Sequence, residues 1–117
     1  MPNDPALDPA LLDPTRFSIV ALLVATKWAD FGFVRDAIGL SDSALSKQIT
    51  TLAKLNYVDV EKGYVGKRPR TWLRLSPTGR QALNAHVAGL HEITRHSEEL
   101  AASYDASEGP VPEPGPA

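Results

Sequence analysis

The 117-residue chain is predicted to fold as a mainly helical domain with one small β-hairpin, in which three helices precede the hairpin and a long helix follows it. Three observations predict this fold class. Residues that cap helices recur along the chain, apolar residues near its middle repeat at helical spacing, and two short stretches alternate apolar with polar residues. A chain of about 100 residues builds one compact core, so a single domain suits this length.

The first helix is predicted to begin where the capping residue Asp13 precedes Pro14, because proline is favoured at the first helical position. The run from Phe17 to Val24 is apolar nearly all round, which indicates a heavily buried helix. We predict that residues 1–14 form a separate N-terminal arm. Its leucines are too apolar for a solvated tail and can dock on the domain: Leu7, Leu11 and Leu12.

The second helix is predicted to be short and to lie between two recognisable ends. Asp30 can cap its start, and the helix then runs from Phe31 to Ile38. It is expected to end at Gly39, since glycine readily adopts the left-handed conformation found where helices stop. The residues expected on its inner face are Phe33, Val34 and Ile38.

The third helix, capped by Ser41 and running from Asp42 to about Asn56, has the clearest pattern. Its inner stripe has helical spacing and consists of Leu45, Ile49, Leu52 and Leu55. Its opposite face holds short polar and basic side chains, namely Ser43, Ser46, Lys47, Thr50 and Lys54. No acidic residue follows Asp42 in this helix, so its outer face is small, polar and basic.

The hairpin is predicted from two alternating stretches, Tyr57 to Lys62 and Thr71 to Leu75. The connection between them, residues 63–70, is rich in glycine and basic residues and is expected to be too long for a two-residue turn. Five cations fall within thirteen residues of this region: Lys62, Lys67, Arg68, Arg70 and Arg74. Lys62 and Arg74 can alternatively pair across the hairpin with Glu61 or Asp59.

A last helix is predicted to start at Ser76-Pro77 and to extend over about residues 77–104, which completes a domain of residues 15–104. Its apolar side continues beyond what a small domain needs for its own core. We therefore expect a dimer interface at Leu90, Ile93, Leu100 and Tyr104. Residues 105–117 are acidic and rich in proline, which predicts a disordered tail.

The net charge of −2 conceals an uneven distribution of charge along the chain. Residues 1–14 carry −3 and residues 97–117 carry −5, and neither segment contains lysine or arginine. All twelve lysines and arginines lie between these segments, where the charge is +6. A basic domain is thus flanked by acidic ends, and the basic part is the one that suits a nucleic-acid partner.

Two short helices joined by a tight turn at Gly39, with a basic hairpin and a further helix after them, predict a winged helix-turn-helix. The small outer face of helix 42–56 fits the major groove of double-stranded DNA, and the basic wing 63–70 can reach the minor groove or the phosphate backbone. The contacts predicted from the residues are, in the helix, Ser43, Ser46, Lys47, Gln48, Thr50 and Lys54, and in the wing, Lys67, Arg68 and Arg70.

Three segments also resemble the small winged-helix transcriptional regulators related to MarR. They are Gly-Leu-Ser-Asp-Ser-Ala-Leu-Ser-Lys at 39–47, Leu-Ala-Lys-Leu-Asn-Tyr at 52–57, and Gly-Lys-Arg-Pro-Arg-Thr-Trp-Leu-Arg-Leu-Ser-Pro-Thr-Gly-Arg at 66–80. The resemblance covers about residues 12–90. It implies a homodimer on a pseudo-palindromic operator, with the first and last helices in the dimer contact. By the family's pattern, Ser43, Ala44, Ser46 and Lys47 match residues that meet DNA.

The leading interpretation is a homodimeric transcriptional regulator, most simply a repressor, that binds DNA of a specific sequence. One alternative is a winged helix used as a protein-interaction module, whose basic face meets an acidic partner. Another is a regulator that senses a small-molecule effector between the helices of the dimer. The sequence shows no polar cluster that marks such an effector pocket.

Catalytic and metal sites are not predicted, so we expect neither an enzyme nor a cofactor. The chain lacks cysteine and the motifs of phosphate loops and serine hydrolases. Successive histidines at 86, 91 and 96 turn by about 140° on a helix and cannot share a face. No run approaches the roughly 18 apolar residues of a membrane helix. The N-terminus does not resemble a signal peptide, so we expect a cytoplasmic location.

Overall fold

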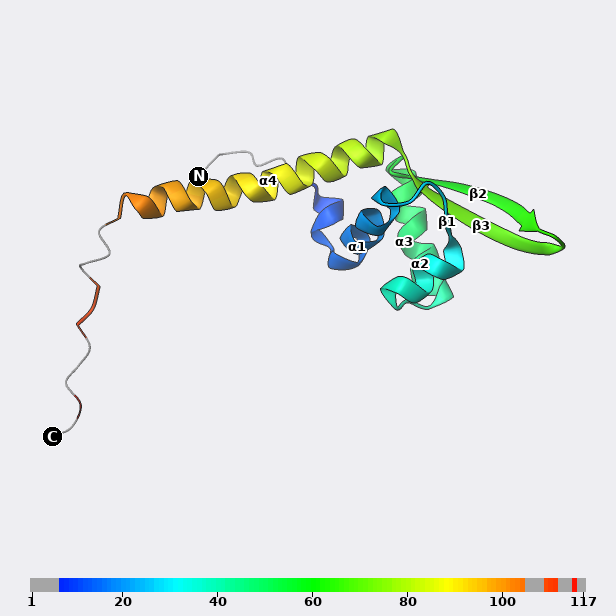
Figure 1. Ribbon diagram of the computed structural model, residues 1–117, viewed down its shortest axis with the longest axis horizontal. Coiled ribbons are helices and arrows are strands. Elements are labelled where there is room, and N and C mark those ends of the chain that lie inside the picture. Colours follow the sequence, from blue (N-terminus) through cyan, green and yellow to red (C-terminus); the bar gives the residue numbers. More distant parts are fainter. Residues whose placement is uncertain (1–6, 105–108, 112–114, 116–117) are drawn as a thin grey trace.

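The computed structural model describes residues 7–104, 109–111 and 115 of the chain (Figure 1). Its elements, in order, are the 3₁₀ helix η1 (Pro9–Leu12), α1 (Pro14–Val24), β1 (Ala29–Asp30), α2 (Phe31–Ile38), α3 (Asp42–Lys54), β2 (Val58–Val65), β3 (Arg68–Leu75) and α4 (Pro77–Ala102). The helices α1, α2 and α3 cluster together, the β2–β3 hairpin projects from this cluster, and α4 extends away from it in the other direction (Figure 1). Most of the tail predicted for residues 105–117, and residues 1–6 of the predicted arm, lie outside the described residues.

The four predicted helix starts are confirmed. Each α-helix follows a residue whose side chain accepts a hydrogen bond from the backbone N–H three residues later: Asp13, Asp30, Ser41 and Ser76. These caps satisfy backbone donors that have no partner inside the helix, which is why short helices such as α2 start at defined positions. α2 ends at Gly39 with φ 80°, the left-handed conformation expected from the sequence.

α3 ends two residues before the predicted position. Its last helical residue is Lys54, and Asn56 adopts the left-handed conformation with φ 61°. The N–H of Tyr57 then donates to the carbonyl of Leu52 at 2.9 Å, and the N–H of Asn56 donates to Ala53 at 3.0 Å. These two bonds close the helix in the way that usually requires glycine, with asparagine in its place.

The hairpin differs from its prediction because its strands are longer and its loop is shorter. β2 pairs with β3 from Val58 opposite Leu75 to Val65 opposite Arg68, so only Gly66 and Lys67 join the strands. The expectation of a connection too long for a two-residue turn is therefore wrong. Gly66 has φ 62° at the first central position, which is where a tight hairpin turn of type II′ requires glycine.

A third strand, β1, was not predicted. It pairs with β3 only through Ala29 opposite Leu73 and Asp30 opposite Trp72, which gives a sheet of order β1-β3-β2. Beyond these two pairs β3 is an edge strand. Pro69 fits into it there because proline is tolerated where no neighbouring strand needs its missing N–H.

The core lies where the helix cluster meets the base of the sheet. Its buried apolar residues come from every element: Leu11, Ile19, Val20, Leu23, Ala29, Val34, Leu45, Ile49, Leu52, Val58, Leu73, Leu75 and Leu83. Phe33, predicted on the inner face of α2, is 52% exposed, so that expectation is wrong. Val34 is fully buried and defines the inner face, and Phe33 is turned from it by about 100° on the helix. Within the described ranges, no helix combines the length and apolar character needed to cross a membrane.

The N-terminal segment docks on the domain through one leucine and several polar contacts. Leu11 is 2% exposed, whereas Leu12 is 57% exposed. The N–H of Asp8 donates to Nδ1 of the buried His86 on α4 at 2.9 Å. The Tyr57 hydroxyl donates to the carboxylate of Asp8. The segment from Asp8 therefore connects α4 with the end of α3.

The Tyr57–Asp8 bond predicts a stability that depends on alkaline pH. The hydrogen bond to the Asp8 carboxylate, together with burial, raises the pKa of Tyr57 from 10.0 to about 12. Because the folded-state pKa is raised, the stabilisation is complete below pH 10 and is lost as the pH rises towards 12. We expect Tyr57→Phe to lower the free energy of unfolding by about 1 kcal/mol at pH 8, with this difference shrinking above pH 10. Urea unfolding at several pH values measures it, and a difference that is constant with pH would contradict the assignment.

Candidate nucleic-acid interface

The outer face of α3 points to solvent because the inner stripe of the helix is packed in the core. Leu45 and Leu52 are fully buried, and Ile49 is 6% exposed. The opposite side chains are exposed, as the sequence pattern requires: Ser43, Ser46, Lys47, Thr50 and Lys54. Leu55, predicted as part of the inner stripe, lies just after the helix and is 40% exposed. α3 therefore offers a face of short polar side chains and two lysines.

Two further candidates on α3 are less accessible. Gln48 is half-buried, and its side-chain oxygen accepts a hydrogen bond from Arg16 of α1 at 3.3 Å. This bond turns Gln48 towards α1. Ala44 is half-buried, and its N–H donates to the capping hydroxyl of Ser41 at 3.1 Å. Ala44 and Gln48 therefore lie at the border between the exposed face and the core.

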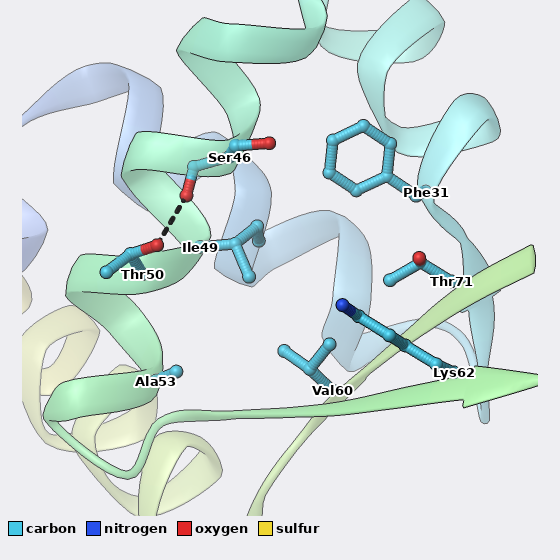
Figure 2. A pocket seen from close by; sticks show the side chains of 8 residues that line it. All are labelled: Phe31, Ser46, Ile49, Thr50, Ala53, Val60, Lys62 and Thr71. Atoms are coloured by element: carbon cyan, nitrogen blue, oxygen red, sulfur yellow. Dashed lines mark hydrogen bonds between the residues drawn. The ribbon is translucent and has the colours of Figure 1, made fainter.

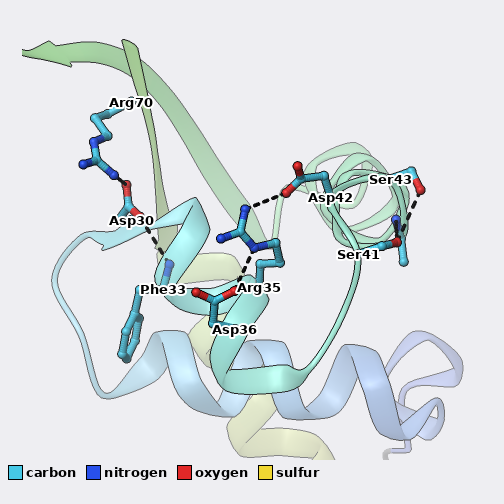
Figure 3. A network of polar contacts seen from close by, with 9 residues as sticks. Asp30, Phe33, Arg35, Asp36, Ser41, Asp42, Ser43 and Arg70 are labelled. Carbon is cyan, nitrogen blue, oxygen red and sulfur yellow. Dashed lines mark hydrogen bonds and ion pairs between the residues drawn. The ribbon is translucent and has the colours of Figure 1, made fainter. Parts of the chain in front are cut away.

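The start of α3 is held against α2 by one arginine, as Figure 3 shows. Arg35 donates to Asp36 on its own helix at 2.9 Å and to Asp42, the first residue of α3, at 2.8 Å. The hydrogen bond from Arg35 lowers the pKa of Asp36, so the carboxylate stays charged and the contact persists at neutral pH. The turn between the two helices is thus fixed by an ion-pair network as well as by Gly39.

The three wing cations occupy different environments. Lys67 and Arg68 lie at the tip of the hairpin, are exposed, and form no ion pair within the described part of the chain. Arg70 is half-buried, and its guanidinium lies 3.4 Å from the carboxylate of Asp30 (Figure 3). Asp30 also caps α2 by accepting from the N–H of Phe33 at 3.2 Å. Arg70 therefore ties the wing to α2, while Lys67 and Arg68 extend freely from its tip.

An open groove of about 530 Å³ connects α3 to the hairpin (Figure 2). It is lined by Phe31, Ser46, Ile49, Thr50, Ala53, Val60, Lys62 and Thr71. Phe31, Ile49, Ala53 and Val60 make part of the lining apolar, and the Thr50 hydroxyl donates to the backbone carbonyl of Ser46 at 2.9 Å. The amino group of Lys62 points from β2 into the groove (Figure 2). The outer face of α3 and the basic hairpin thus form one continuous surface.

Lys62 is a candidate that the sequence pattern left open. Cross-strand pairing with Glu61 or Asp59 was one alternative for Lys62 and Arg74. Arg74 does pair with Asp59, at 2.9 Å, and its guanidinium lies over the ring of Trp28 at 4.4 Å from the ring centre. Lys62 makes no such pair in the described part of the chain, because strand alternation places it on the other face of the hairpin. The alternation of side chains along β2 is the sequence signal that could have placed Lys62 and Arg74 on opposite faces of the hairpin.

α4 carries a single apolar stripe, which is buried in the first half of the helix and partly exposed in the second. Its first half, with Gly79, Leu83 and His86, is buried against the domain. The same stripe continues with Leu90, which is 41% exposed, and Ile93, which is half-buried. Further on lie Leu100, 53% exposed, and Tyr104, 71% exposed, just beyond the end of the helix. The second half of α4 extends past the domain (Figure 1).

The comparisons with known proteins agree on one fold. The model of a family described as the winged helix DNA-binding domain matches residues 15–94. An uncharacterized protein of Methanocaldococcus jannaschii, MJ0432, is 22% identical to this chain over 83 residues, which are 71% of this chain and 90% of that protein.

Three solved structures are similar to the chain. A transcriptional regulator homologue from Pyrococcus horikoshii OT3 matches with a TM-score of 0.69 and 22% identity over 74% of this chain and 86% of that one. The M. tuberculosis regulator MosR, solved with DNA, matches with a TM-score of 0.61 and 24% identity over 86% and 70% of the two chains. The zinc-responsive MarR family member ZitR of Lactococcus lactis matches with a TM-score of 0.52 and 17% identity over 80% and 64%.

The matched residues include all the elements that form the candidate interface. The family match spans α1 to most of α4, and so includes the capped helix pair α2–α3 and the hairpin beside it. The solved regulators share this arrangement of helices, wing and long terminal helix. The chain belongs to the winged helix DNA-binding domain family and has the fold of the MarR-like transcriptional regulators.

Proposed function

We propose that this protein regulates transcription as a homodimer on a pseudo-palindromic operator, with α3 in the major groove and the wing 63–70 on the minor groove or the backbone. The observation that carries the proposal is the continuous surface formed by α3, the groove and the basic hairpin. A reading helix and a wing must contact the same stretch of duplex, and one open groove between them satisfies that condition.

The face of α3 suits the major groove because its side chains are short. The major groove, about 12 Å wide, admits an α-helix, and short outer side chains let the helix backbone come close to the base edges. Ser43, Ser46 and Thr50 meet this requirement, and Lys47 can reach a base edge or a phosphate. The N-terminal half of such a helix is the part that contacts bases in helix-turn-helix proteins, which favours Ser43 and Lys47 over Lys54.

The wing contributes through its tip. Lys67 lies in the turn and Arg68 in the last residue pair before it, and both exposed side chains are available for phosphates or for the minor groove, where arginine is favoured. Arg70 holds the hairpin to α2 through Asp30 and so helps to set the distance between tip and helix. The wing is therefore a positioned arm whose tip carries two cations that pair with none of the described residues.

The groove between α3 and the wing suits one strand of the DNA backbone, with Lys62 as a phosphate contact. We expect Lys62→Ala to weaken binding to specific and non-specific DNA alike and to reduce the slope of log affinity against log salt by about 0.9. Titrations at several salt concentrations measure both effects. Arg80→Ala is the matched control, because it removes one exposed cation on α4 away from the groove. If both variants lose the same affinity, the effect is one of net charge and Lys62 has no special role.

The dimer is supported by the exposed half of the apolar stripe on α4. Leu90, Ile93, Leu100 and Tyr104 recur at steps typical of packed helices, and none of them belongs to the hydrophobic core of the described domain. A second copy related by a twofold axis offers the same stripe in return. Two domains related in this way read two half-sites of an inverted repeat. We propose repression, which follows where the operator overlaps a promoter and the bound dimer excludes polymerase.

Selection of bound fragments from a pool of random duplex DNA tests the proposal as a whole. The expected product is an inverted repeat whose half-sites are centred about 10 base pairs, or a multiple of a helical turn, apart. Enrichment of a single, asymmetric half-site would remove the dimer from the proposal. An absence of any enriched sequence would leave the basic face as a surface for an acidic protein partner and would refute specific DNA binding.

A further inference from the structure

The two tryptophans of the chain line one recess on the face of the hairpin that is turned away from α3. Trp28 precedes β1, and Trp72 lies in β3 directly opposite Glu61 of β2. Together these three side chains line a recess of about 310 Å³. Because side chains alternate along a strand, Glu61 and Trp72 point away from the groove that Lys62 and Thr71 line. The recess is thus separate from the proposed DNA surface.

Of the charged side chains around the recess, Arg74 has an ion-pair partner, whereas Glu61 has none among the described residues. Arg74 lies over the ring of Trp28, but its guanidinium is also paired with the carboxylate of Asp59 at 2.9 Å. Glu61 accepts no hydrogen bond and forms no ion pair with any described residue, although the cation of Arg74 lies on the same face of the sheet. The recess therefore combines two indole rings with a carboxylate that has no partner in the described part of the chain.

A glycine leaves space beside the second indole. Gly63 lies two residues after Glu61 on the same face of β2, and a methyl group there would stand 3.9 Å from the indole nitrogen of Trp72. Its φ is not positive, so the backbone does not require glycine at this position. A methyl group there would already be in van der Waals contact with the indole, and glycine leaves that edge of the ring uncovered by a side chain at position 63.

We propose that this recess binds an organic cation, a small ammonium ion that carries alkyl groups. The faces of aromatic rings attract cations. Arg74 already occupies one face of Trp28, so the ion would contact the indole of Trp72 and the remaining surface of Trp28 that lines the recess. The alkyl groups of such an ion fill the space between two rings, and its charge meets the carboxylate of Glu61. An anion is disfavoured by that carboxylate, and a small metal ion would lose more hydration on entering the recess than an alkylammonium ion does.

Choline and its neutral isostere 3,3-dimethylbutan-1-ol provide the test, because they share a shape and differ in charge. Isothermal titration of the full-length protein with choline chloride, against a sodium chloride blank of equal ionic strength, is expected to show saturable binding below about 50 mM. The neutral isostere is expected to bind at least about tenfold more weakly. The fluorescence of the two tryptophans, both of which line the recess, should change along the same binding curve.

Two variants make the outcome specific. Glu61→Gln keeps the shape of an exposed side chain and is expected to weaken choline binding about tenfold. Lys62→Ala, on the opposite face of the same strand, is expected to bind choline as the unaltered protein does. Absence of saturable binding, equal binding of the neutral isostere, or an unchanged affinity in Glu61→Gln would each overturn the inference. None of these results depends on whether the protein binds DNA.

Discussion

Replacing Gly79 with alanine is expected to lower the free energy of unfolding by about 3 kcal/mol, at the upper end of what overpacking a core costs. Gly79 lies in the first turn of α4, where the helix crosses the end of α3 and the base of the hairpin. A methyl group there would stand 2.3 Å from the carbonyl oxygen of Tyr57 and 2.6 Å from a methyl carbon of Leu75. Leu75 can rotate away, but Tyr57 presents backbone. That carbonyl already accepts a hydrogen bond from the N–H of Ser76 at 2.9 Å, which holds it in place.

Thermal and urea unfolding of Gly79→Ala measure the effect, with an expected fall in melting temperature of about 15 °C. Gln81→Ala is the matched control, because it is an exposed position in the same turn region of α4 and is expected to change stability by less than about 0.5 kcal/mol. A Gly79→Ala protein as stable as the control would mean that α4 can move off Tyr57 at little cost. The close approach would then have no part in fixing the direction of α4.

Placing a charge in the exposed apolar stripe of α4 is expected to produce the largest effect on DNA binding. Leu100→Glu puts a carboxylate where the proposed seam buries a leucine that is 53% exposed in the isolated chain. A buried charge without a partner disfavours association, so the dimer should dissociate. Each freed domain then holds a single half-site, and the loss of the second, tethered contact is expected to reduce operator affinity at least about a hundredfold. The domain itself should stay folded, because Leu100 lies outside the core.

Sedimentation and operator titration of the same samples measure the two effects together. Ala88→Glu is the control for the added charge, because Ala88 is exposed on α4 and lies about 160° around the helix from Leu90. This variant is expected to remain dimeric and to bind the operator within about threefold of the unaltered protein. A Leu100→Glu protein that remains dimeric would refute the seam. A monomer that retains full operator affinity would instead refute the need for two copies.

The helices were predictable from local chemistry because their ends are encoded by single residues. A cap needs one side chain and one N–H, so Asp13, Asp30, Ser41 and Ser76 each mark a start without reference to the rest of the fold. The end of α3 was less predictable because Asn56 takes the left-handed conformation there. Asparagine tolerates it but also occurs in many other settings, so it marks an end less clearly than glycine does.

The predicted strands of the hairpin are too short because the structural effect of a glycine or proline depends on its neighbours in space. Gly63 and Pro69 read as breakers in a sequence, yet both lie in paired strands, because β3 lacks a second neighbour at Pro69. β1 has two residues, too few to show any alternation. Its strand pairing is a consequence of how α1 and α2 place the chain beside β3. Phe33 is another example, since an aromatic residue beside an apolar one indicates burial in sequence but faces solvent here.

The chemistry of the candidate interface was predictable in composition but not in geometry. The exposed face of α3 follows from helical spacing alone. The different environments of the wing cations do not follow from sequence spacing, because Arg70 pairs with an aspartate forty residues away. The same holds for Lys62, whose direction depends on which face of the hairpin turns to α3. The DNA-contact roles of these residues stay predictions until they are tested.

The length and continuity of α4 have a consequence for the spacing of any operator. The same 26-residue helix is anchored in the domain at one end and carries the exposed stripe at the other, and it continues unbroken through the buried Gly89 that lies between the two parts. Two domains joined through such helices have no hinge with which to adjust their separation. Inserting one residue after Leu90 would turn the stripe by about 100° relative to α3. In the proposed dimer, α4 therefore fixes the distance between the two DNA-binding domains. A change of one base pair between half-sites should reduce operator affinity far more than it does for regulators whose domains are joined by flexible linkers.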